Sequence, residues 1–343
     1  MAEINFYFIL IASVGFDLLI GDPKFLFHPV EFIGIYIKRV TNLFIKNFNQ
    51  DSNILFFGGA FISLSTISLS YLAGKCVEIV YFKSELNNFC GLLIMVGLSS
   101  CLACKSLISS VKEISHLIQN QFIYQTPKNL IIEKVRRIVS RDVEKSSIDE
   151  LIRASTESLT ENSVDGIFAP LLWIFVGTYL IKYSIYLPGP LSLGFAYKAI
   201  STLDSMIGYK DNYFLKLGFF SAKIEDYATY IPCKIVVFTL PLISKNFKRY
   251  FYIVRKVFEE GSRYESPNAG FSEGVFAHSV DIKLGGESKY NNDYILKPIL
   301  NEKGSNCDLK SINKICNLIL KLEFFWILFF SLIYFFSISA APN

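Results

Sequence analysis

Residues 54–73 read ILFFGGAFISLSTISLSYLA and contain no charged side chain. A helix of this length can cross the roughly 30 Å hydrocarbon core of a bilayer. Residues 322–341 form a similar run with a single charge, Glu323. Of the 343 residues, 52% are hydrophobic and 19% are charged, whereas soluble domains average about 45–50% apolar and about 25% charged residues. The pattern predicts an all-α integral membrane protein that crosses the bilayer several times.

Outward from this run, five to six transmembrane helices are expected within a single multi-pass domain, residues 1–343. The expected spans are 4–20, 54–73, 89–108, 168–187 and 322–341, with a more polar one at 191–207. Residues 231–243 are short and contain two prolines, which favours a re-entrant or bundle-packed helix. Lys75 and Glu78 follow the second span and are expected in a short outer loop.

Two long polar regions, residues 109–166 and 245–321, carry many of the lysines and arginines. Cytoplasmic loops of membrane proteins are enriched in these residues, so both regions are expected on the cytoplasmic side of the cell membrane. The N-terminus has no basic n-region and no small-residue cleavage site, which favours an uncleaved first span. The net charge of +4, without a dense basic block, gives no indication of a nucleic-acid partner.

The stretch ESLTENSVDGIFAPLLW, residues 157–173, places three acidic residues beside an apolar run. Glu157, Glu161 and Asp165 are spaced four residues apart, so they share one helix face, where like charges repel. Pairing with Arg153, four residues before Glu157, would be a structural explanation, but it leaves two carboxylates unexplained at a membrane edge. Carboxylate oxygens suit Mg²⁺, which often takes substrate phosphates as further ligands. This helix is therefore a candidate metal–phosphate site.

Two further stretches combine ionisable residues with unusual positions. GDPKFLFHPV, residues 21–30, holds Asp22 and His28 beside X-Pro bonds that keep the chain extended, although a helix stop followed by a turn explains it equally well. AYKAISTLDSMIGYK, residues 196–210, carries Lys198 and Asp204. Ionisable groups at membrane depth are functional candidates or partners of one another.

The last two stretches give weaker signals. SAKIEDYATYIP, residues 221–232, places Lys223 and Asp226 on one face, which a solvated helix face would explain nearly as well. SPNAGFSEG, residues 266–274, reads as a flexible turn that leads into a helix, and the free N–H groups of a helix N-terminus can bind an anion. The chain contains no Walker A motif, so ATP, if used, is not held by a P-loop.

Taken together, these stretches resemble the CobD/CbiB family, the adenosylcobinamide-phosphate synthases of cobalamin biosynthesis. The matching motifs occur in the family's order: GDPKFLFHPVEFIG, SRDVEK at 140–145, ESLTENSVDGIFAPLLW, AYKAISTLDSMIGYK, SAKIEDYATYIP and SPNAGFSEG. The chain departs from the family's pattern at Phe271, where a tryptophan is usual, and at Thr229 and Tyr230, where Asn-Trp is usual.

The resemblance implies a ligase that uses ATP and Mg²⁺. Such an enzyme joins (R)-1-amino-2-propanol or its O-phosphate to the f propionate of adenosylcobyric acid through an amide bond, with ethanolamine as an alternative amine. The implied partners are these substrates, the lipid bilayer and neighbouring enzymes of the pathway.

The resemblance also places the site residues. It identifies the positions, and the division into roles is our own inference. We assign catalytic roles to Glu157, Glu161, Asp165, Lys198 and Asp204, the first three also as Mg²⁺ ligands. The implied substrate- and phosphate-binding residues are Asp22, His28, Arg141, Asp142, Asn162, Lys223, Asp226, Ser266 and Asn268.

The alternative from another class is a non-enzymatic membrane protein, either a sensor similar to AmpE-type proteins or a transporter. A transporter would place its ionisable residues near the bilayer midplane. This chain has most of them at the ends of spans and in loops, which favours a membrane-anchored enzyme.

Overall fold

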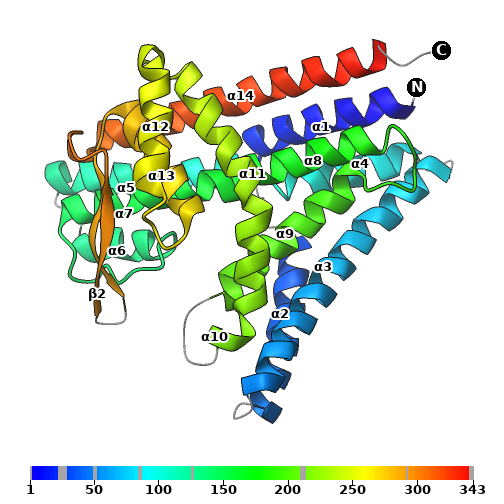
Figure 1. Cartoon of the computed structure of the whole chain (residues 1–343), viewed down its shortest axis with the longest axis horizontal. Coiled ribbons are helices and arrows are strands. Elements are labelled where there is room, and N and C mark those ends of the chain that lie inside the picture. The colour runs from blue at the N-terminus through cyan, green and yellow to red at the C-terminus, as the bar shows by residue number, and fades with distance from the viewer. Residues whose placement is uncertain are drawn as a thin grey trace. The chain divides into compact units, whose positions relative to one another are not determined.

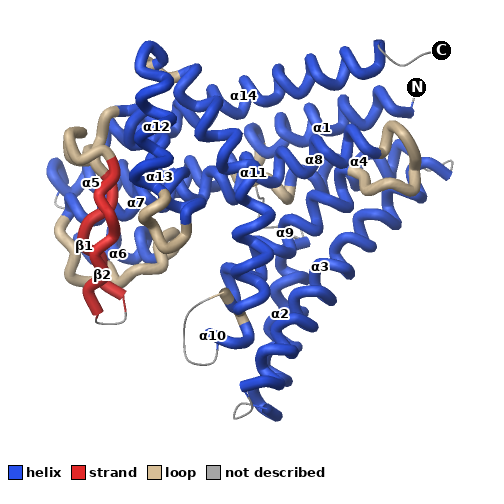
Figure 2. The backbone as a smooth tube through the Cα atoms, in the orientation of Figure 1, coloured by secondary structure: helices blue, strands red, loops and turns tan. Residues whose placement is uncertain are grey.

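The computed structural model describes residues 2–21, 29–48, 52–83, 87–124, 127–208, 214–290 and 293–339. The fold is mostly helical, with one pair of strands in the described part (Figures 1 and 2). The elements of the first half are α1 (Ala2–Leu19), α2 (Pro29–Phe48), α3 (Ser52–Lys83), α4 (Asn87–Ser99), α5 (Cys104–Tyr124), α6 (Lys128–Arg136), α7 (Ile148–Ser163), the π-helical turn η1 (Val164–Phe168) and α8 (Ala169–Leu180). Those of the second half are α9 (Pro190–Ile207), α10 (Phe214–Leu217), α11 (Phe219–Ile243), the 3-10 turn η2 (Phe247–Arg249), α12 (Tyr250–Gly261), α13 (Pro267–Val280), β1 (Leu284–Tyr290), β2 (Asp293–Leu300) and α14 (Leu309–Ser339).

Five helical stretches among the described residues are long and apolar enough to cross a membrane. They are Asn53–Lys83, Asn88–Gln121, Ile148–Leu180, Phe219–Ile243 and Leu309–Ser337, and Phe6–Leu19 adds a shorter apolar helix. The prediction of an all-α membrane protein with about five to six spans is confirmed. The short segment expected at 231–243 is the second half of α11, which continues through Pro232 and Pro241.

The prediction of a loop after residue 73 is wrong, because α3 continues to Lys83. Lys75 and Glu78 face the protein interior with 7% and 0% of their surface exposed, and their charged groups lie 3.5 Å apart. Glu78 Oε1 accepts the backbone N–H groups of Leu191 (2.7 Å) and Ser192 (3.0 Å), the first turn of α9. A carboxylate at a helix N-terminus is favoured by the helix dipole, so this pair stabilises a buried joint between α3 and α9.

Helix α7 starts where the sequence signals a start. The Ser147 hydroxyl accepts the Glu150 N–H at 3.2 Å, and the Glu150 carboxylate accepts the Ser147 N–H at 2.6 Å. This reciprocal capping box satisfies two N–H groups that have no partner within the helix. The π-helical turn η1 follows directly and contains Asp165. Such single turns of π-helix often occur at functional sites.

The contacts divide the chain into two compact units. Unit 1 comprises Met1–Lys105, Asp165–Tyr230 and Phe330–Asn343, and unit 2 comprises Ser106–Val164 and Ile231–Phe329. The two regions expected to be cytoplasmic, 109–166 and 245–321, fall almost wholly within unit 2.

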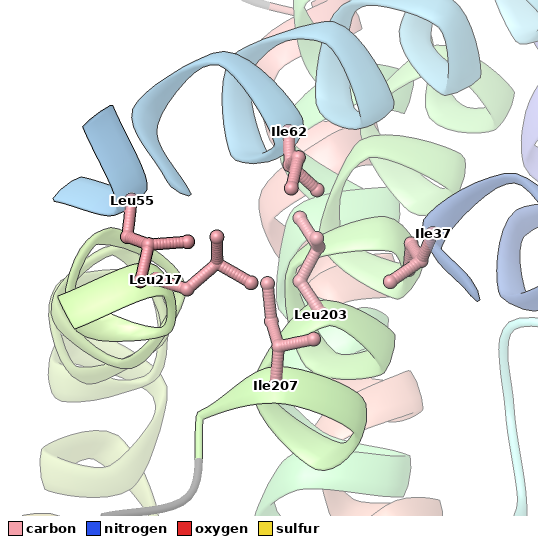
Figure 3. Packing of buried hydrophobic residues seen from close by; sticks show 6 residues of the cluster. All are labelled: Ile37, Leu55, Ile62, Leu203, Ile207 and Leu217. Carbon is pink, nitrogen blue, oxygen red and sulfur yellow. The ribbon is translucent and has the colours of Figure 1, made fainter. Parts of the chain in front are cut away.

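Unit 1 is built around α3 and α9, which pack along each other and against α2, α4 and α8. One apolar cluster of this unit joins α2, α3, α9 and α10 (Figure 3). Its fully or nearly fully buried members are Ile37, Leu55, Ile62, Leu203, Ile207 and Leu217. At the other end of the unit, Tyr7 of α1 stacks on Tyr334 of α14 with ring centroids 4.8 Å apart. Aromatic stacking thus ties the two terminal helices together.

Unit 2 contains the antiparallel hairpin of β1 and β2, drawn in red in Figure 2. Helix α13 packs against α12, α7 and both strands. A register shift between Leu284 and Gly286 marks a bulge in β1, and bulges are common where a strand must redirect a group toward a site.

Candidate functional site

Glu157 lies in a fully assembled ion pair within unit 2. Its Oε2 accepts a hydrogen bond from Arg141 Nη1 at 2.7 Å, and its Oε1 accepts the Gly285 N–H at 3.0 Å. Arg141 Nη1 also donates to the Ser288 hydroxyl at 2.6 Å. Both charged side chains are buried, with 8% and 5% of their side-chain surfaces exposed. This pair connects α7 to β1 and to the segment before α7.

The bulged start of β1 depends on two glycines. Gly285 and Gly286 have φ angles of +84° and +91°, a region that L side chains rarely adopt. A Cβ on Gly285 would lie 2.1 Å from the Pro298 carbonyl oxygen. The Arg153 guanidinium donates to the carbonyl oxygens of Gly285 and Glu287. The ion pair with a glutamate of its own helix that the spacing suggested is present, since Arg153 Nη1 lies 3.8 Å from Glu157 Oε1, while its hydrogen bonds go to β1.

Glu161, one turn after Glu157, is partly buried and uncommitted. Its carboxylate forms no hydrogen bond and no ion pair within 4.0 Å to another residue that the structure describes. The charges of Lys297 and Glu157 both act on it, the first attractive and the second repulsive. Of the two glutamates, Glu161 is therefore the one with both oxygens available to a ligand.

A second buried carboxyl, Glu273 of α13, lies in the same unit and is fully buried. Its Oε2 accepts the Tyr264 hydroxyl at 3.3 Å, and its Oε1 lies 3.6 Å from Lys297 Nζ. Burial, and then the nearby Glu157 carboxylate, raise the pKa of Glu273 to about 8, although Lys297 opposes the shift. Glu273 is therefore mainly protonated at neutral pH. Electrostatic coupling to Glu157 extends the acid cluster beyond the residues of α7.

Sequence reasoning did not single out Glu273, Tyr264 or Lys297. Glu273 stands within the quoted SPNAGFSEG stretch, so that stretch was the available signal. Lys297 belongs to no motif, and only the pairing of β2 with β1 brings it toward the glutamates.

Asp142 lies at the outer edge of this site. Its Oδ1 accepts the Glu144 N–H at 3.2 Å, and its Oδ2 lies 3.4 Å from Lys289 Nζ. The hydrogen bond from Glu144 and the Lys289 ammonium hold the pKa of Asp142 below its usual range. Its backbone N–H donates to the Lys289 carbonyl at 2.9 Å, so Asp142 helps to fasten the SRDVEK segment to β1.

The other expected binding residues of unit 2 are placed by local contacts. The Asn162 amide donates to the Ser158 carbonyl oxygen at 2.9 Å and to its hydroxyl at 2.8 Å. Ser266 is the residue before α13, but its side chain does not cap the helix. Asn268 is buried, and its carbonyl oxygen accepts a hydrogen bond from the Cys233 thiol at 3.3 Å.

In unit 1, Asp165 and Asp204 belong to a polar group around a buried tyrosine. Tyr197 is 2% exposed, its hydroxyl lies 3.1 Å from the Thr229 hydroxyl, and Thr229 donates to Glu225. Asp165, Glu225 and Asp204 all lie close enough to Tyr197 to act on it electrostatically. The structure thus brings these two expected acids into one neighbourhood.

The expected lysines of unit 1 differ in setting. Lys198 of α9 is half-buried. Lys223 and Asp226 form an exposed ion pair of 3.5 Å along α11, with 55% and 36% of their side-chain surfaces exposed. That geometry fits a solvated helix face. Asp22 and His28 lie outside the described residues.

A Mg²⁺ ion held by protein groups alone needs several ligand oxygens close together. Within the described residues of unit 2, no three His, Cys, Asp or Glu ligand atoms lie within 4.8 Å of one another. A closed, all-protein cage is thus not formed there. Mg²⁺ more often uses one or two carboxylates together with waters and substrate phosphates. The uncommitted carboxylate of Glu161 fits that open kind of site.

The fold and this geometry define a helical integral membrane protein with a buried, acid-rich polar site. The sequence profile of the CobD/Cbib protein family matches residues 10–319. The chain belongs to the CobD/CbiB family.

Curated relatives agree with this assignment. The chain is 37% identical over 296 residues to the cobalamin biosynthesis protein CobD of Synechocystis sp., which covers 86% of this chain and 82% of that protein. It is 32% identical over 327 residues to the protein of the same name from Leptospira interrogans, covering 94% and 96%. It is also 32% identical over 335 residues to that of Clostridium acetobutylicum, covering 94% and 97%. No solved structure matches the chain.

Proposed function

We propose that this protein acts in cobalamin biosynthesis as an adenosylcobinamide-phosphate synthase. It would join (R)-1-amino-2-propanol, or its O-phosphate, to the f propionate of adenosylcobyric acid. The observation that carries the proposal is the similarity over 86–94% of the chain to relatives named for cobalamin biosynthesis. The six motifs quoted above give the resemblance its chemical content.

The reaction needs an activated carboxylate, because a carboxylate and an ammonium ion do not condense spontaneously in water. Transfer of the γ-phosphoryl group of ATP to a propionate oxygen gives an acyl phosphate and ADP. The amine nitrogen then attacks the carbonyl carbon, the bond from that carbon to the phosphate oxygen breaks, and phosphate leaves. The ammonium proton passes to a base before the attack. Bound Mg²⁺ would offset the negative charge of the phosphate oxygens.

Glu161 is the carboxylate that we assign to the metal–phosphate complex. Its neighbour Glu157 uses both oxygens on Arg141 and Gly285, so we assign Glu157 to holding the site in shape. Preorganised groups of this kind lower the cost of ordering a site when substrate binds. Asp165, Lys198 and Asp204 of unit 1 remain candidates for contacts with the second substrate.

The proposed location is the cell membrane, with the two long polar regions of the sequence on the cytoplasmic side. The abundance of Lys and Arg in residues 109–166 and 245–321 supports this orientation. A cytoplasmic site would give access to ATP, and neighbouring enzymes of the pathway are candidate partners.

An amidation assay tests the proposal. Detergent-purified protein is incubated with adenosylcobyric acid, aminopropanol phosphate, ATP and Mg²⁺, and the corrinoid products and ADP are quantified. Wild type is compared with Glu161→Gln and with Glu302→Gln, a control at an exposed glutamate of the same unit. We expect Mg²⁺-dependent cobinamide phosphate from wild type and the control, and at least a hundredfold less from Glu161→Gln.

Two results would change the assignment. Equal product from Glu161→Gln and wild type would keep the enzyme and return Glu161 to a structural role. No product from folded wild type with aminopropanol, its phosphate or ethanolamine would contradict the proposed function and favour a sensor or transporter.

A further inference from the structure

A polar cleft lies on the surface of unit 2, between the SRDVEK segment, the start of α7 and the hairpin. Its volume is about 110 Å³, which is room for several water molecules and hence for a group the size of phosphate. Four cationic side chains line it: Arg141, Lys145, Arg153 and Lys289. Because these come from three separate segments, the fold itself gathers them.

Arg141 provides the main observation, because it is more than nine-tenths buried and still has donor capacity to spare. Its Nη1 is used by Glu157 and Ser288. Its Nη2 is buried and has no hydrogen-bond partner among the described residues. Leaving a buried charged donor without an acceptor costs about 1–3 kcal/mol or more. Because Arg141 is also one of the residues that line the cleft, this unpartnered donor points to an anionic ligand that supplies the missing acceptor.

The carboxylates that also line the cleft are mostly committed to protein donors. Asp142 accepts the Glu144 N–H and faces Lys289, and Glu150 accepts the Ser147 N–H. By contrast, Lys145 is exposed and forms no ion pair with a carboxylate in the described part of the chain. Glu287, which is exposed at the rim, is the remaining acidic side chain.

The N-terminus of α7 adds to the positive potential. Ser146, the residue before the N-cap Ser147, and Glu150 of the first turn line the cleft, and the positive end of a helix dipole favours an anion there. A guanidinium, an ammonium and a helix N-terminus together match the several oxygens of a phosphate better than the two of a carboxylate.

We propose that this cleft binds the phosphate group of a substrate, with Arg141 Nη2 and Lys145 Nζ as its principal donors. The identity of the molecule that carries this phosphate rests on the proposed function, which has two phosphate-bearing substrates: the aminopropanol O-phosphate and ATP. The cleft itself follows from the geometry alone.

The test measures binding of three probes to full-length detergent-purified protein by isothermal titration calorimetry in phosphate-free buffer. The probes are inorganic phosphate, aminopropanol O-phosphate and ATP without Mg²⁺. Lys145→Gln is the informative variant, because loss of Arg141 would also leave Glu157 unpaired. Glu287→Gln removes the rim carboxylate, and Lys303→Gln is a matched control at an exposed lysine away from the cleft.

We expect Lys145→Gln to weaken phosphate binding about fivefold, as for loss of one partly exposed charge contact. Glu287→Gln should tighten it two- to threefold, and Lys303→Gln should leave it unchanged. The substrate whose affinity falls in parallel with phosphate in Lys145→Gln is the natural source. The proposal that the cleft binds phosphate would be overturned by either of two results. One is an unchanged affinity of Lys145→Gln for all three probes, and the other is no binding of any probe to folded wild type.

These outcomes are separable from those of the proposed function. If Lys145→Gln weakens phosphate binding but the wild type forms no amide product, the phosphate site is supported and the proposed synthase activity is contradicted. If Lys145→Gln forms amide product with an unchanged KM for both phosphate-bearing substrates, the synthase activity is supported and the phosphate site in the cleft is contradicted.

Discussion

Replacement of Arg141 by methionine removes one half of the buried ion pair and leaves Glu157 charged inside the protein. Breaking a buried pair from one side typically costs about 3–5 kcal/mol, because the remaining charge is uncompensated. Here Glu157 keeps the Gly285 N–H at 3.0 Å and has Arg153 at 3.8 Å. These contacts reduce the expected loss of stability to about 2–4 kcal/mol.

The assay is thermal unfolding of detergent-purified protein followed by circular dichroism. A loss of this size should lower the unfolding temperature by about 5 °C or more. Arg136→Met is the matched control, since Arg136 forms an ion pair of 3.2 Å with Glu144 while 59% and 64% of these side chains are exposed. Exposed pairs contribute about 0–1 kcal/mol, so this control should stay within about 2 °C of wild type.

The double variant Arg141→Met with Glu157→Gln separates the ion pair from lost packing. With both charges removed, the uncompensated charge disappears while the amide can still accept the Gly285 N–H. We therefore expect the double variant to be more stable than Arg141→Met alone. If the two substitutions are strictly additive, or if Arg141→Met unfolds at the temperature of wild type, the assignment of a buried, coupled pair is wrong.

Three further predictions concern the same unit. Glu273→Gln should remove a pH-dependent loss of stability. Because the pKa of Glu273 is raised from 4.5 to about 8, its protonated form stabilises the fold below pH 4.5, and this contribution fades as the pH rises to 8. The wild type should thus lose more stability than the variant between pH 5 and 8 in thermal scans, and parallel curves would contradict the shift. Gly285→Ala should destabilise by more than ~1 kcal/mol, because its φ of +84° and the Pro298 carbonyl leave no room for a Cβ; a neutral result in the same scans would argue against the bulge. Ser147→Ala should cost about 1 kcal/mol through loss of the α7 cap, whereas Ser147→Asp should retain most of the stability.

The membrane class and the start of α7 could be predicted from sequence, because each rests on local information. An uncharged run such as 54–73 has few other stable locations. The Ser147–Glu150 spacing encodes a capping box that needs only residues three apart. The motif stretches also contain Arg141 and Glu157, which the structure joins in one ion pair; their functional roles stay a prediction.

What the sequence did not show depends on contacts distant along the chain. Lys75 and Glu78 were predicted to lie in a loop because charges are unfavourable within an apolar helix. They pair with each other instead, and Glu78 accepts backbone N–H groups at the start of α9. Helix spacing pairs Glu157 with Arg153, which lies 3.8 Å away, but it gives no sign of the closer partner, Arg141, which comes from a segment 16 residues away. Lys297 reaches the site through strand pairing, which has no signal in helix periodicity.

Isotope transfer tests the central claim, ATP-dependent amide formation, most directly. Adenosylcobyric acid labelled with ¹⁸O in its free carboxylate is converted by purified protein with ATP, Mg²⁺ and aminopropanol phosphate. The released inorganic phosphate is then examined by mass spectrometry. The proposed acyl phosphate predicts amide product together with one ¹⁸O in each phosphate released. Amide product with unlabelled phosphate would contradict activation of the carboxylate by phosphoryl transfer, and absence of product from folded protein would contradict the synthase itself.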